Sequence, residues 1–323
     1  MDISVIVCTY NRAANLPLCL GRLAGQQGVE GLRWEVLVVD NNSTDSTRDT
    51  VAELARALPI DIRYAFEPQQ GLNYARNRGA RESLGRCFGY IDDDIQTSPG
   101  WLAALHDALA GRDADAVGGR IHLDPGVRLP KWIQPEMYGF LGYQDFGEEP
   151  FQMDGVSRYP FGGNMFFNRR VIDRIGLFNP LLGRRGAGQR RGELFKGAET
   201  DYFHRLAAHG GARIFYEPRA IVYHQVQPFQ ITKKYFRTIH YNAGYQKALH
   251  DEREFRRTLL GVPLFMFPQL ARNAATYLRQ LVTQGPDVAF RQQMTVGNFV
   301  GAMLGYARRA RTQGSAGRPE AAG

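Results

Sequence analysis

The chain has 323 residues, of which 44% are hydrophobic and 22% are charged, a composition typical of globular proteins rather than disordered or fibrous ones. Three cysteines are too few for a disulfide framework, and no apolar run approaches the roughly 20 residues that a membrane-spanning helix needs. The N-terminus also lacks the basic segment and cleavage site of a signal peptide. We therefore expect a cytoplasmic protein, either soluble or attached to the inner face of the cell membrane.

Strand-like and helix-like segments alternate through the first part of the chain. A continuous, mostly β-branched run predicts a buried strand over Ile3–Thr9, and further strands are predicted over Trp34–Val39, Ile62–Phe66, Cys87–Ile91 and Asp115–Leu123. Apolar residues at helical spacing predict helices over residues 16–23, 51–58, 72–84 and 101–109. This alternation predicts an α/β fold with a Rossmann-like, mostly parallel sheet and flanking helices.

The pattern changes after residue 123. Residues 124–158 are rich in Gly, Pro and aromatic residues without a period, which predicts long loops over a site. A strand over residues 157–168, a helix over 200–209 and a strand pair over 212–224, broken at Pro218, are expected next, and the chain is helical and aromatic beyond Pro228. We expect one domain over residues 1–228, a C-terminal helical extension over 229–311 and a disordered tail over 312–323.

The net charge of +8 comes from the C-terminal part alone. Residues 1–231 hold 26 Lys and Arg against 27 Asp and Glu, whereas residues 232–323 hold 14 against 5. This asymmetry is typical of a surface that meets phosphates, on lipids or on nucleic acid, or else of solvated helix faces.

Three acids end the fourth predicted strand. Because side chains alternate along a strand, Asp92 and Asp94 share a face and Asp93 points elsewhere. Crowded carboxylates repel one another unless a cation lies between them. At the carboxyl edge of a parallel sheet this indicates a ligand site; the alternative is a turn with an acidic helix cap.

Other segments accompany this triplet in a fixed order, namely residues 5–12, 38–45, 71–80, 161–165 and 197–201, and Tyr223-His224. With these motifs the chain closely resembles the GT-A glycosyltransferases of family 2, over roughly residues 1–245. The resemblance implies a GT-A fold for residues 1–228 and an inverting transfer of a sugar, from a UDP-sugar as the expected donor, to a saccharide or lipid-linked acceptor in polysaccharide or glycolipid synthesis.

The resemblance also implies roles for individual residues. Glu199 corresponds to the catalytic base and Asp201 is the alternative, while Asp94 and His224 correspond to ligands of Mn²⁺ or Mg²⁺. The nucleotide-sugar would be held by Thr9, Tyr10, Arg12, Asp40, Arg76, Asp92, Asp93, Gly163 and Asn164. Many relatives carry Glu-Asp where this chain has Ala198-Glu199, which leaves the choice between Glu199 and Asp201 open.

Each role has a structural alternative. Asp40 could cap the following helix, Glu199 could simply benefit from a helix N-terminus, and His224 could be a satisfied core histidine. Arg76 could be a surface residue paired with an acid. The ordered set of motifs favours the functional roles of these residues over the structural alternatives.

Rival functions are less consistent with the motifs. A sugar-nucleotide pyrophosphorylase or a dinucleotide-dependent dehydrogenase needs a glycine-rich loop after the first strand, where this chain has Cys8-Thr9-Tyr10-Asn11-Arg12. A non-catalytic carbohydrate- or phosphate-binding protein would leave the acidic residues unexplained, and we expect no nucleic-acid partner.

The C-terminal extension combines basic and aromatic residues. One helical group has the apolar residues Tyr235, Phe236, Ile239, Ala243 and Leu249 beside the basic residues Lys233, Lys234, Arg237 and Lys247. A second group has Phe299, Met303 and Tyr306 near Arg308, Arg309 and Arg311. Between them, Leu264–Phe267 adds apolar surface. Such helices are typical of an interfacial membrane anchor. The alternative is packing against the first domain or against a second copy of the chain.

Overall fold

The computed structural model describes residues 1–188, 190–251 and 253–316, and the chain divides into two compact units. Unit 1 comprises residues 1–128, 135–187 and 197–227. Unit 2 comprises residues 129–134, 188–196 and the described residues from Pro228 onward. Two short excursions of the chain thus belong to the same unit as the C-terminal helices.

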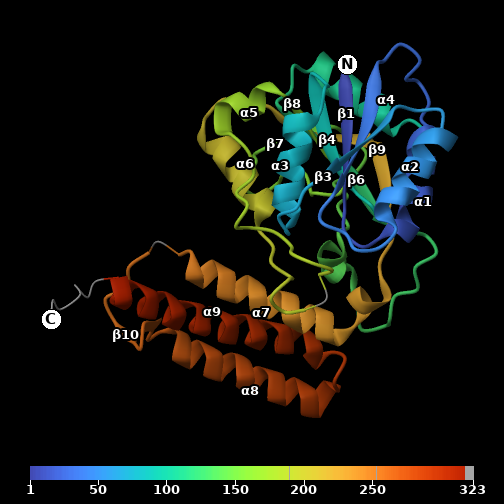
Figure 1. Ribbon diagram of the computed structural model, residues 1–323. Coiled ribbons are helices and arrows are strands. Elements are labelled where there is room, and N and C mark those ends of the chain that lie inside the picture. Colours follow the sequence, from blue (N-terminus) through green and yellow to red (C-terminus); the bar gives the residue numbers. More distant parts are fainter. Residues whose placement is uncertain (189, 252, 317–323) are drawn as a thin grey trace. The chain divides into compact units, whose positions relative to one another are not determined.

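Unit 1 is built on one mixed sheet, which contains nine strands of the described chain (Figure 1). Its order is β3-β2-β1-β4-β8-β6-β9-β5, and β7 pairs with β9. The strands are β1 (Ile3–Thr9), β2 (Trp34–Asp40), β3 (Ile62–Phe66), β4 (Cys87–Asp92), β5 (Ile95–Thr97), β6 (Ala116–Leu123), β7 (Phe151–Met153), β8 (Met165–Asn168) and β9 (Ile214–His224). The first four strands are parallel, as predicted, whereas β8 runs antiparallel to both β4 and β6.

Helices cover both faces of this sheet. One face packs against α1 (Leu16–Ala24), α2 (Thr47–Ala57) and α4 (Trp101–Gly111), and the other against α3 (Leu72–Glu82), α5 (Arg170–Ile175) and α6 (Ala198–Ala208). A short 3₁₀ helix, η1 (Ala13–Asn15), precedes α1. Alternation along β1 explains the two cores, because Val5 and Val7 enter one and Ile6 enters the other. Strands that are buried on both faces in this way are the origin of the continuous apolar runs.

Two predicted strands differ from the observed ones. The strand predicted over residues 157–168 is confined to β8. The strand pair predicted over residues 212–224 is instead the single strand β9, and Pro218 falls where the pairing shifts from Gly119 with Glu217 to Arg120 with Ile221. Proline has no N–H to donate to a ladder, and a bulge accommodates it without ending the strand.

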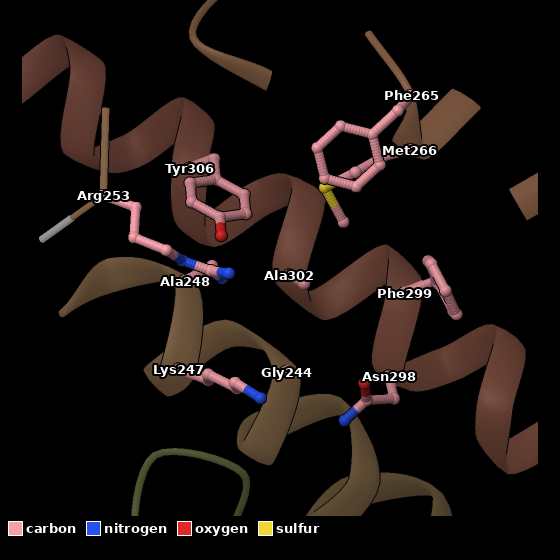
Figure 2. Close-up of a pocket in the computed structure, with 10 residues that line it drawn as sticks. All are labelled: Gly244, Lys247, Ala248, Arg253, Phe265, Met266, Asn298, Phe299, Ala302 and Tyr306. Atoms are coloured by element: carbon pink, nitrogen blue, oxygen red, sulfur yellow. The ribbon is translucent and has the colours of Figure 1, made fainter. Parts of the chain in front are cut away.

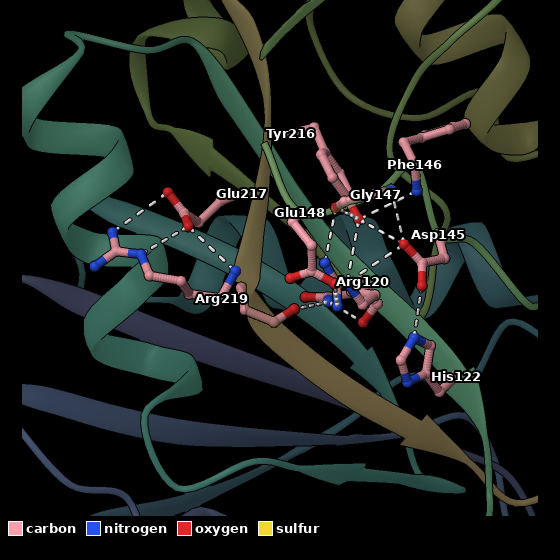
Figure 3. Close-up of polar contacts among 11 residues, drawn as sticks. Arg120, His122, Asp145, Phe146, Gly147, Glu148, Tyr216, Glu217 and Arg219 are labelled. Atoms are coloured by element: carbon pink, nitrogen blue, oxygen red, sulfur yellow. Dashed lines mark hydrogen bonds and ion pairs between the residues drawn. The ribbon is translucent and has the colours of Figure 1, made fainter. Parts of the chain in front are cut away.

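A polar network anchors the loop that follows the 3₁₀ helix η2 (Pro135–Leu141) to the sheet (Figure 3). The buried guanidinium of Arg120, on β6, lies 3.4 Å from Asp145 and 3.0 Å from Glu148. Nε2 of His122, two residues along the same strand, lies 2.8 Å from the other Asp145 oxygen. These contacts attach to the sheet a loop that the sequence predicts only as irregular.

Unit 2 is mainly helical, as predicted. It contains η3 (Pro228–Ile231), α7 (Lys233–Leu249), α8 (Met266–Gln284) and α9 (Ala289–Ala316), together with a hairpin of β10 (Thr258–Leu259) and β11 (Val262–Pro263) that the sequence analysis missed. The first five residues of the predicted tail belong to α9, and its remainder, residues 317–323, lies outside the described residues.

Glycines bring α7 and α9 into close contact. A Cβ on Gly244 would lie 2.0 Å from the carbonyl oxygen of Asn298, and a Cβ on Gly301 would lie 2.1 Å from that of Tyr241. Only a residue without a side chain fits at such a distance. The two helices therefore pack backbone to backbone at these positions.

A small pocket of about 170 Å³ lies in unit 2, where the start of α8 meets α7 and α9 (Figure 2). Its lining combines apolar side chains with two cations, and comprises Gly244, Lys247, Ala248, Arg253, Phe265, Met266, Asn298, Phe299, Ala302 and Tyr306. Arg253 is paired with Asp251 at 2.8 Å. Among the described residues, no helix has the length and apolarity needed to cross a bilayer.

Candidate active site

The predicted site residues meet at one edge of the parallel half of the sheet. In the strand register, Thr9 at the end of β1 pairs with Asp40 at the end of β2, and Cys8 pairs with Asp92 at the end of β4. The carboxyl ends of these three strands therefore present their side chains and loops to the same edge, where ligands bind in open α/β sheets.

Asp40 lies in a polar environment at this edge. Its side chain is buried, Oδ1 accepts a hydrogen bond from the backbone N–H of Ser43 at 2.9 Å, and Oδ2 accepts one from the hydroxyl of Tyr64 at 2.8 Å. Burial and the Asp40 carboxylate raise the pKa of Tyr64 to about 12. The sequence analysis missed Tyr64, although its position on β3, opposite Val38, places it beside β2.

Asparagines join the loops around Asp40. Oδ1 of Asn11 accepts from the backbone N–H of Thr44 at 2.7 Å, which ties the loop after β1 to the loop after β2. Oδ1 of Asn41 accepts from the N–H of Gly71 at 2.8 Å, just before α3. Tyr10, next to Asn11, is half-buried. These hydrogen bonds fix the loops at this edge of the sheet relative to one another.

Asp93 is tied to the loop after β1. Its Oδ2 accepts from the Thr9 hydroxyl at 2.7 Å, and its Oδ1 accepts from Nη1 of Arg12 at 2.9 Å. Burial raises the pKa of Asp93 to about 6, although the Arg12 charge opposes the shift. In this structure Thr9, Arg12 and Asp93 thus brace the turn that carries the neighbouring acids.

Asp94 and His224 come together from the turn after β4 and the end of β9. Oδ1 of Asp94 lies 3.4 Å from Nε2 of His224, and it is buried without a partner that meets hydrogen-bond geometry in the described chain. Nδ1 of His224 lies 2.7 Å from the carbonyl oxygen of Leu141, which can only accept, so Nδ1 carries the proton. Burial would lower the pKa of His224, but the charge and hydrogen bond of Asp94, the Asp92 charge and the Leu141 carbonyl together raise it. A divalent cation bound at Nε2 would take the place of the proton there.

This pair fits a divalent cation. A carboxylate oxygen and an imidazole nitrogen are ligands that Mn²⁺ accepts, and the backbone hydrogen bond on Nδ1 is the support that a ligating histidine usually has. Burial alone would raise the pKa of Asp94, but His224 and Arg12 together lower it. No group of three or more His, Cys, Asp or Glu side chains suited to a metal occurs in the described residues. Within the part of the chain that the structure describes, Asp94 and His224 are the pair suited to such a cation here.

Arg76 and Glu199 form the second charged pair. Nη2 of Arg76, a fully buried side chain on α3, donates to Oε1 of Glu199 at 2.9 Å. A Cβ on Gly162 would lie 2.2 Å from that oxygen and 2.3 Å from that nitrogen. Burial would raise the pKa of Glu199, but the charge and hydrogen bond of Arg76, a backbone hydrogen bond and the Arg184 charge together lower it. Glu199 is therefore an ionised carboxylate, with a quarter of its side chain exposed.

Asp201, two residues after Glu199 on α6, contacts a different partner. Its Oδ2 accepts from Nε of Arg205 at 3.0 Å, and Arg205 also donates to the carbonyl oxygen of Leu177 at 2.9 Å. Asp201 therefore helps to attach α6 to the segment after α5, whereas Glu199 meets Arg76 and Gly162.

Gly163 and Asn164 differ in what they contact. A Cβ on Gly163 would lie 3.7 Å from Oδ2 of Asp92, so this glycine borders the acidic edge. Asn164 is completely buried, and its amide donates to the carbonyl oxygen of Ala220 at 2.9 Å and accepts from Nε1 of Trp101 at 2.9 Å. Because these bonds occupy its side chain, we assign Asn164 to holding the sheet and α4 together, and do not include it in the proposed donor site.

Arg184 is a further charged residue near the site. It lies in the basic loop over residues 184–191, and its positive charge lowers the pKa of Asp94 and of Glu199. Its carbonyl oxygen accepts from the N–H of Leu72, which attaches this part of the loop to the start of α3. Only the fold brings Arg184 close enough for its charge to act on these acids.

The mixed sheet, the acidic edge beyond β4 and the acid at the start of α6 together define a GT-A glycosyltransferase. Residues 4–176 match the family described as Glycosyl transferase family 2, which covers more than half of the chain. The chain therefore belongs to glycosyl transferase family 2, and it is a glycosyltransferase. This membership sets aside the pyrophosphorylase, the dehydrogenase and the non-catalytic binding protein.

Curated relatives extend the similarity beyond that match. The chain is 26% identical over 287 residues to a glucosyl-dolichyl phosphate glucuronosyltransferase of Haloferax volcanii, covering 87% of this chain and 83% of the relative. It is 29% identical to the succinoglycan biosynthesis protein ExoM of Rhizobium meliloti, covering 70% and 67%. The chain is thus similar to a transferase named for a lipid-linked sugar and to a protein named for the biosynthesis of a polysaccharide.

Solved structures share the fold. The mannosyltransferase PcManGT of Pyrobaculum calidifontis, in complex with GDP-Man and Mn²⁺, matches with a TM-score of 0.58 and 19% identity, over 94% of this chain and 86% of that one. Residues 1–349 of S. aureus TarS, in complex with UDP-GlcNAc, match with a TM-score of 0.55 and 16% identity, over 98% and 92%. At these identities the likeness supports the fold alone.

Proposed function

We propose that the protein is an inverting, metal-dependent glycosyltransferase that moves a sugar from a nucleotide-sugar, with UDP as the expected nucleotide, to an acceptor hydroxyl. The observation that carries this proposal is the pairing of Asp94 with His224. A buried carboxylate oxygen without a hydrogen-bond partner, 3.4 Å from an imidazole nitrogen, suits a shared cation.

Asp94 and His224 would hold Mn²⁺ or Mg²⁺ together with oxygens of the donor diphosphate and water. When bound, the cation screens the negative charge that develops on the departing diphosphate. Two protein ligands alone bind a cation weakly, so affinity for the metal is expected to rise with nucleotide. The mixed oxygen and nitrogen set favours Mn²⁺, because Mg²⁺ prefers oxygen ligands.

The donor nucleotide is assigned to the edge formed by the ends of β1, β2 and β4. Asp40 keeps unused lone pairs beside its two hydrogen bonds and would accept from an N–H of the base, with Tyr10 beside it. Asp92 would contact the ribose, and Gly163 leaves room for the sugar to approach. Arg184 would meet the diphosphate, since its charge already acts on Asp94.

Glu199 is proposed as the base. Its ionised carboxylate, held in place by Arg76, would take the proton of the acceptor hydroxyl as that oxygen attacks the anomeric carbon. A single displacement with one base inverts the configuration at that carbon. Asp201 is the less favoured choice because Arg205 engages its carboxylate.

The acceptor is proposed to be a saccharide or a lipid-linked sugar, as the names of the relatives suggest. A lipid-linked acceptor resides at a membrane, and we propose peripheral attachment at the cytoplasmic face. The basic charge of residues 232–323 supports this location.

Calorimetric titration of the full chain with UDP, GDP, TDP and CDP tests the proposal, each with Mn²⁺ and with EDTA. We expect one nucleotide to bind only with metal, and Asp94→Ala to abolish that binding. Asp113→Ala, at an exposed carboxylate paired with Arg170, is the matched control and should bind like the parent. Failure of every nucleotide to bind folded protein would reject the proposal.

A further inference from the structure

α8 exposes an apolar stripe along its length. Only Met266 of its nineteen residues is buried, and the exposed apolar residues are Phe267, Ala271, Ala275, Leu278 and Val282. At 3.6 residues per turn these five positions occupy about a quarter of the helix circumference. The opposite side of α8 contacts α9, where Asn273 bonds Gln292 and Tyr277 bonds Gln293. The stripe is therefore a second, outward face.

The stripe continues into the preceding hairpin. Leu260, at the turn between β10 and β11, is 83% exposed, and Leu259 beside it is 53% exposed. Leu264 and Phe265, which join the hairpin to α8, are also exposed. Exposed apolar side chains scattered singly need no explanation, but a continuous series from a hairpin tip along a helix marks an interaction surface.

Positively charged side chains flank the stripe. Arg272 and Arg279 lie one after the other along the same flank of the stripe, both exposed, and α8 contains no acidic residue. Arg256 and Arg257 precede the hairpin and are exposed as well. A second copy of α8 placed along the stripe would bring four guanidinium groups together without any acid of α8 to neutralise them. Anionic lipid headgroups complement the same arrangement.

We propose that the α8 stripe and the hairpin tip, Leu259 and Leu260, form the surface that docks on an anionic lipid bilayer. The apolar stripe enters the headgroup boundary while Arg272 and Arg279 contact lipid phosphates, as for an amphipathic helix that lies in the interface. This inference rests on the membrane attachment proposed above and assigns it to one surface. It differs from the sequence-based expectation, because Tyr235, Phe236 and Ile239 of α7 are buried.

Co-sedimentation of the full chain with vesicles tests the docking surface. Vesicles of phosphatidylcholine alone are compared with vesicles of phosphatidylcholine mixed with phosphatidylglycerol. We expect binding to the anionic vesicles only. Leu278→Gln/Val282→Gln should weaken it on the order of 100-fold, and Arg272→Gln/Arg279→Gln roughly tenfold or more.

Matched controls lie in unit 1. Leu84 is 58% exposed, against 57% for Leu278, so Leu84→Gln removes an equally exposed leucine elsewhere. Arg56→Gln removes an exposed arginine on α2. Both control variants should bind vesicles like the parent. Circular dichroism and nucleotide titration of every variant verify that the fold and the donor site are intact.

Three results would overturn the inference. They are unchanged vesicle binding by Leu278→Gln/Val282→Gln, equal binding of the parent to neutral vesicles, or a dimer in analytical ultracentrifugation that the same variant abolishes. If the protein binds nucleotide but does not bind the vesicles, the docking surface is rejected and the proposed function stands. If the protein binds the anionic vesicles but none of the nucleotides, the proposed function is rejected and the docking surface stands.

Discussion

Nη2 of Arg76 and Oε1 of Glu199 lie 2.9 Å apart, and both atoms pack against the backbone of Gly162. The pair joins α3 to the start of α6 across 123 residues of sequence. The ion pair keeps Glu199 ionised close to the sheet edge that carries Asp92, and Gly162 leaves space for the two side chains. Three predictions follow from this arrangement and a fourth concerns unit 2.

Gly162→Ala should displace the ion pair, because the added Cβ would come within 2.2 Å of Glu199 and 2.3 Å of Arg76. A misplaced catalytic group of this kind costs about 10²-fold in kcat. Gly21→Ala, on α1, is the control, since its Cβ would meet nothing within 4 Å. Steady-state kinetics should show no comparable loss for Gly21→Ala. Equal losses in both variants would contradict the role given to Gly162.

Glu199→Gln should lower kcat by roughly 10²–10⁴-fold with nucleotide binding retained, because it removes the proposed base and keeps its size. Asp201→Asn should have a small effect on kcat and should reduce stability by about 0.3–0.5 kcal/mol, the usual worth of an exposed i,i+4 ion pair with Arg205. Turnover assays and calorimetry on both variants distinguish the two acids. A large loss of kcat confined to Asp201→Asn would move the base to that residue.

Replacing Arg76 should alter the pH dependence of turnover. Burial raises the pKa of Glu199, and the charge and hydrogen bond of Arg76, a backbone hydrogen bond and the Arg184 charge together lower it below its ordinary value. In the parent the base form therefore persists at pH values below the ordinary carboxyl range. In Arg76→Met the charge and hydrogen bond of Arg76 are lost, so the pKa of Glu199 rises and the acid limb of the kcat profile moves to higher pH.

Arg76→Lys serves as the comparison for this experiment, because it keeps a positive charge at the same position. Its acid limb should lie between those of the parent and Arg76→Met. Circular dichroism across the pH range separates titration from unfolding, which is needed because Arg76 is buried. Coincident acid limbs in all three folded proteins would show that Arg76 does not control the protonation of the base.

Gly301→Ala should destabilise unit 2. The new Cβ would lie 2.1 Å from the carbonyl oxygen of Tyr241, so α7 and α9 must separate, at a cost of about 1–3 kcal/mol. Gly297→Ala, one turn earlier on α9, meets nothing within 4 Å and should stabilise the helix by roughly 0.5–1 kcal/mol. Urea unfolding of both variants measures the difference. Equal stabilities would mean that α7 and α9 are not packed as closely as described.

The sequence by itself determined the elements whose signal is local. Strands β1 to β4 are largely apolar segments bounded by polar loops, and they pair in parallel as predicted. The acids at the end of β4 and at the start of α6 were found as motifs, because neighbouring residues in a motif stay neighbours in the fold. Family membership rests on this ordered set.

Tertiary structure alone decided which distant residues meet. The contacts of Arg76 with Glu199, of Tyr64 with Asp40 and of Asn164 with Trp101 join elements that are far apart in the sequence. Likewise, α7 and α8 are both amphipathic, yet packing buries Tyr235 and Phe236 of α7 and leaves the stripe of α8 exposed. Periodicity reveals that a helix has an apolar face, but what that face contacts depends on sheet register and helix packing, which bring together residues that no local pattern relates.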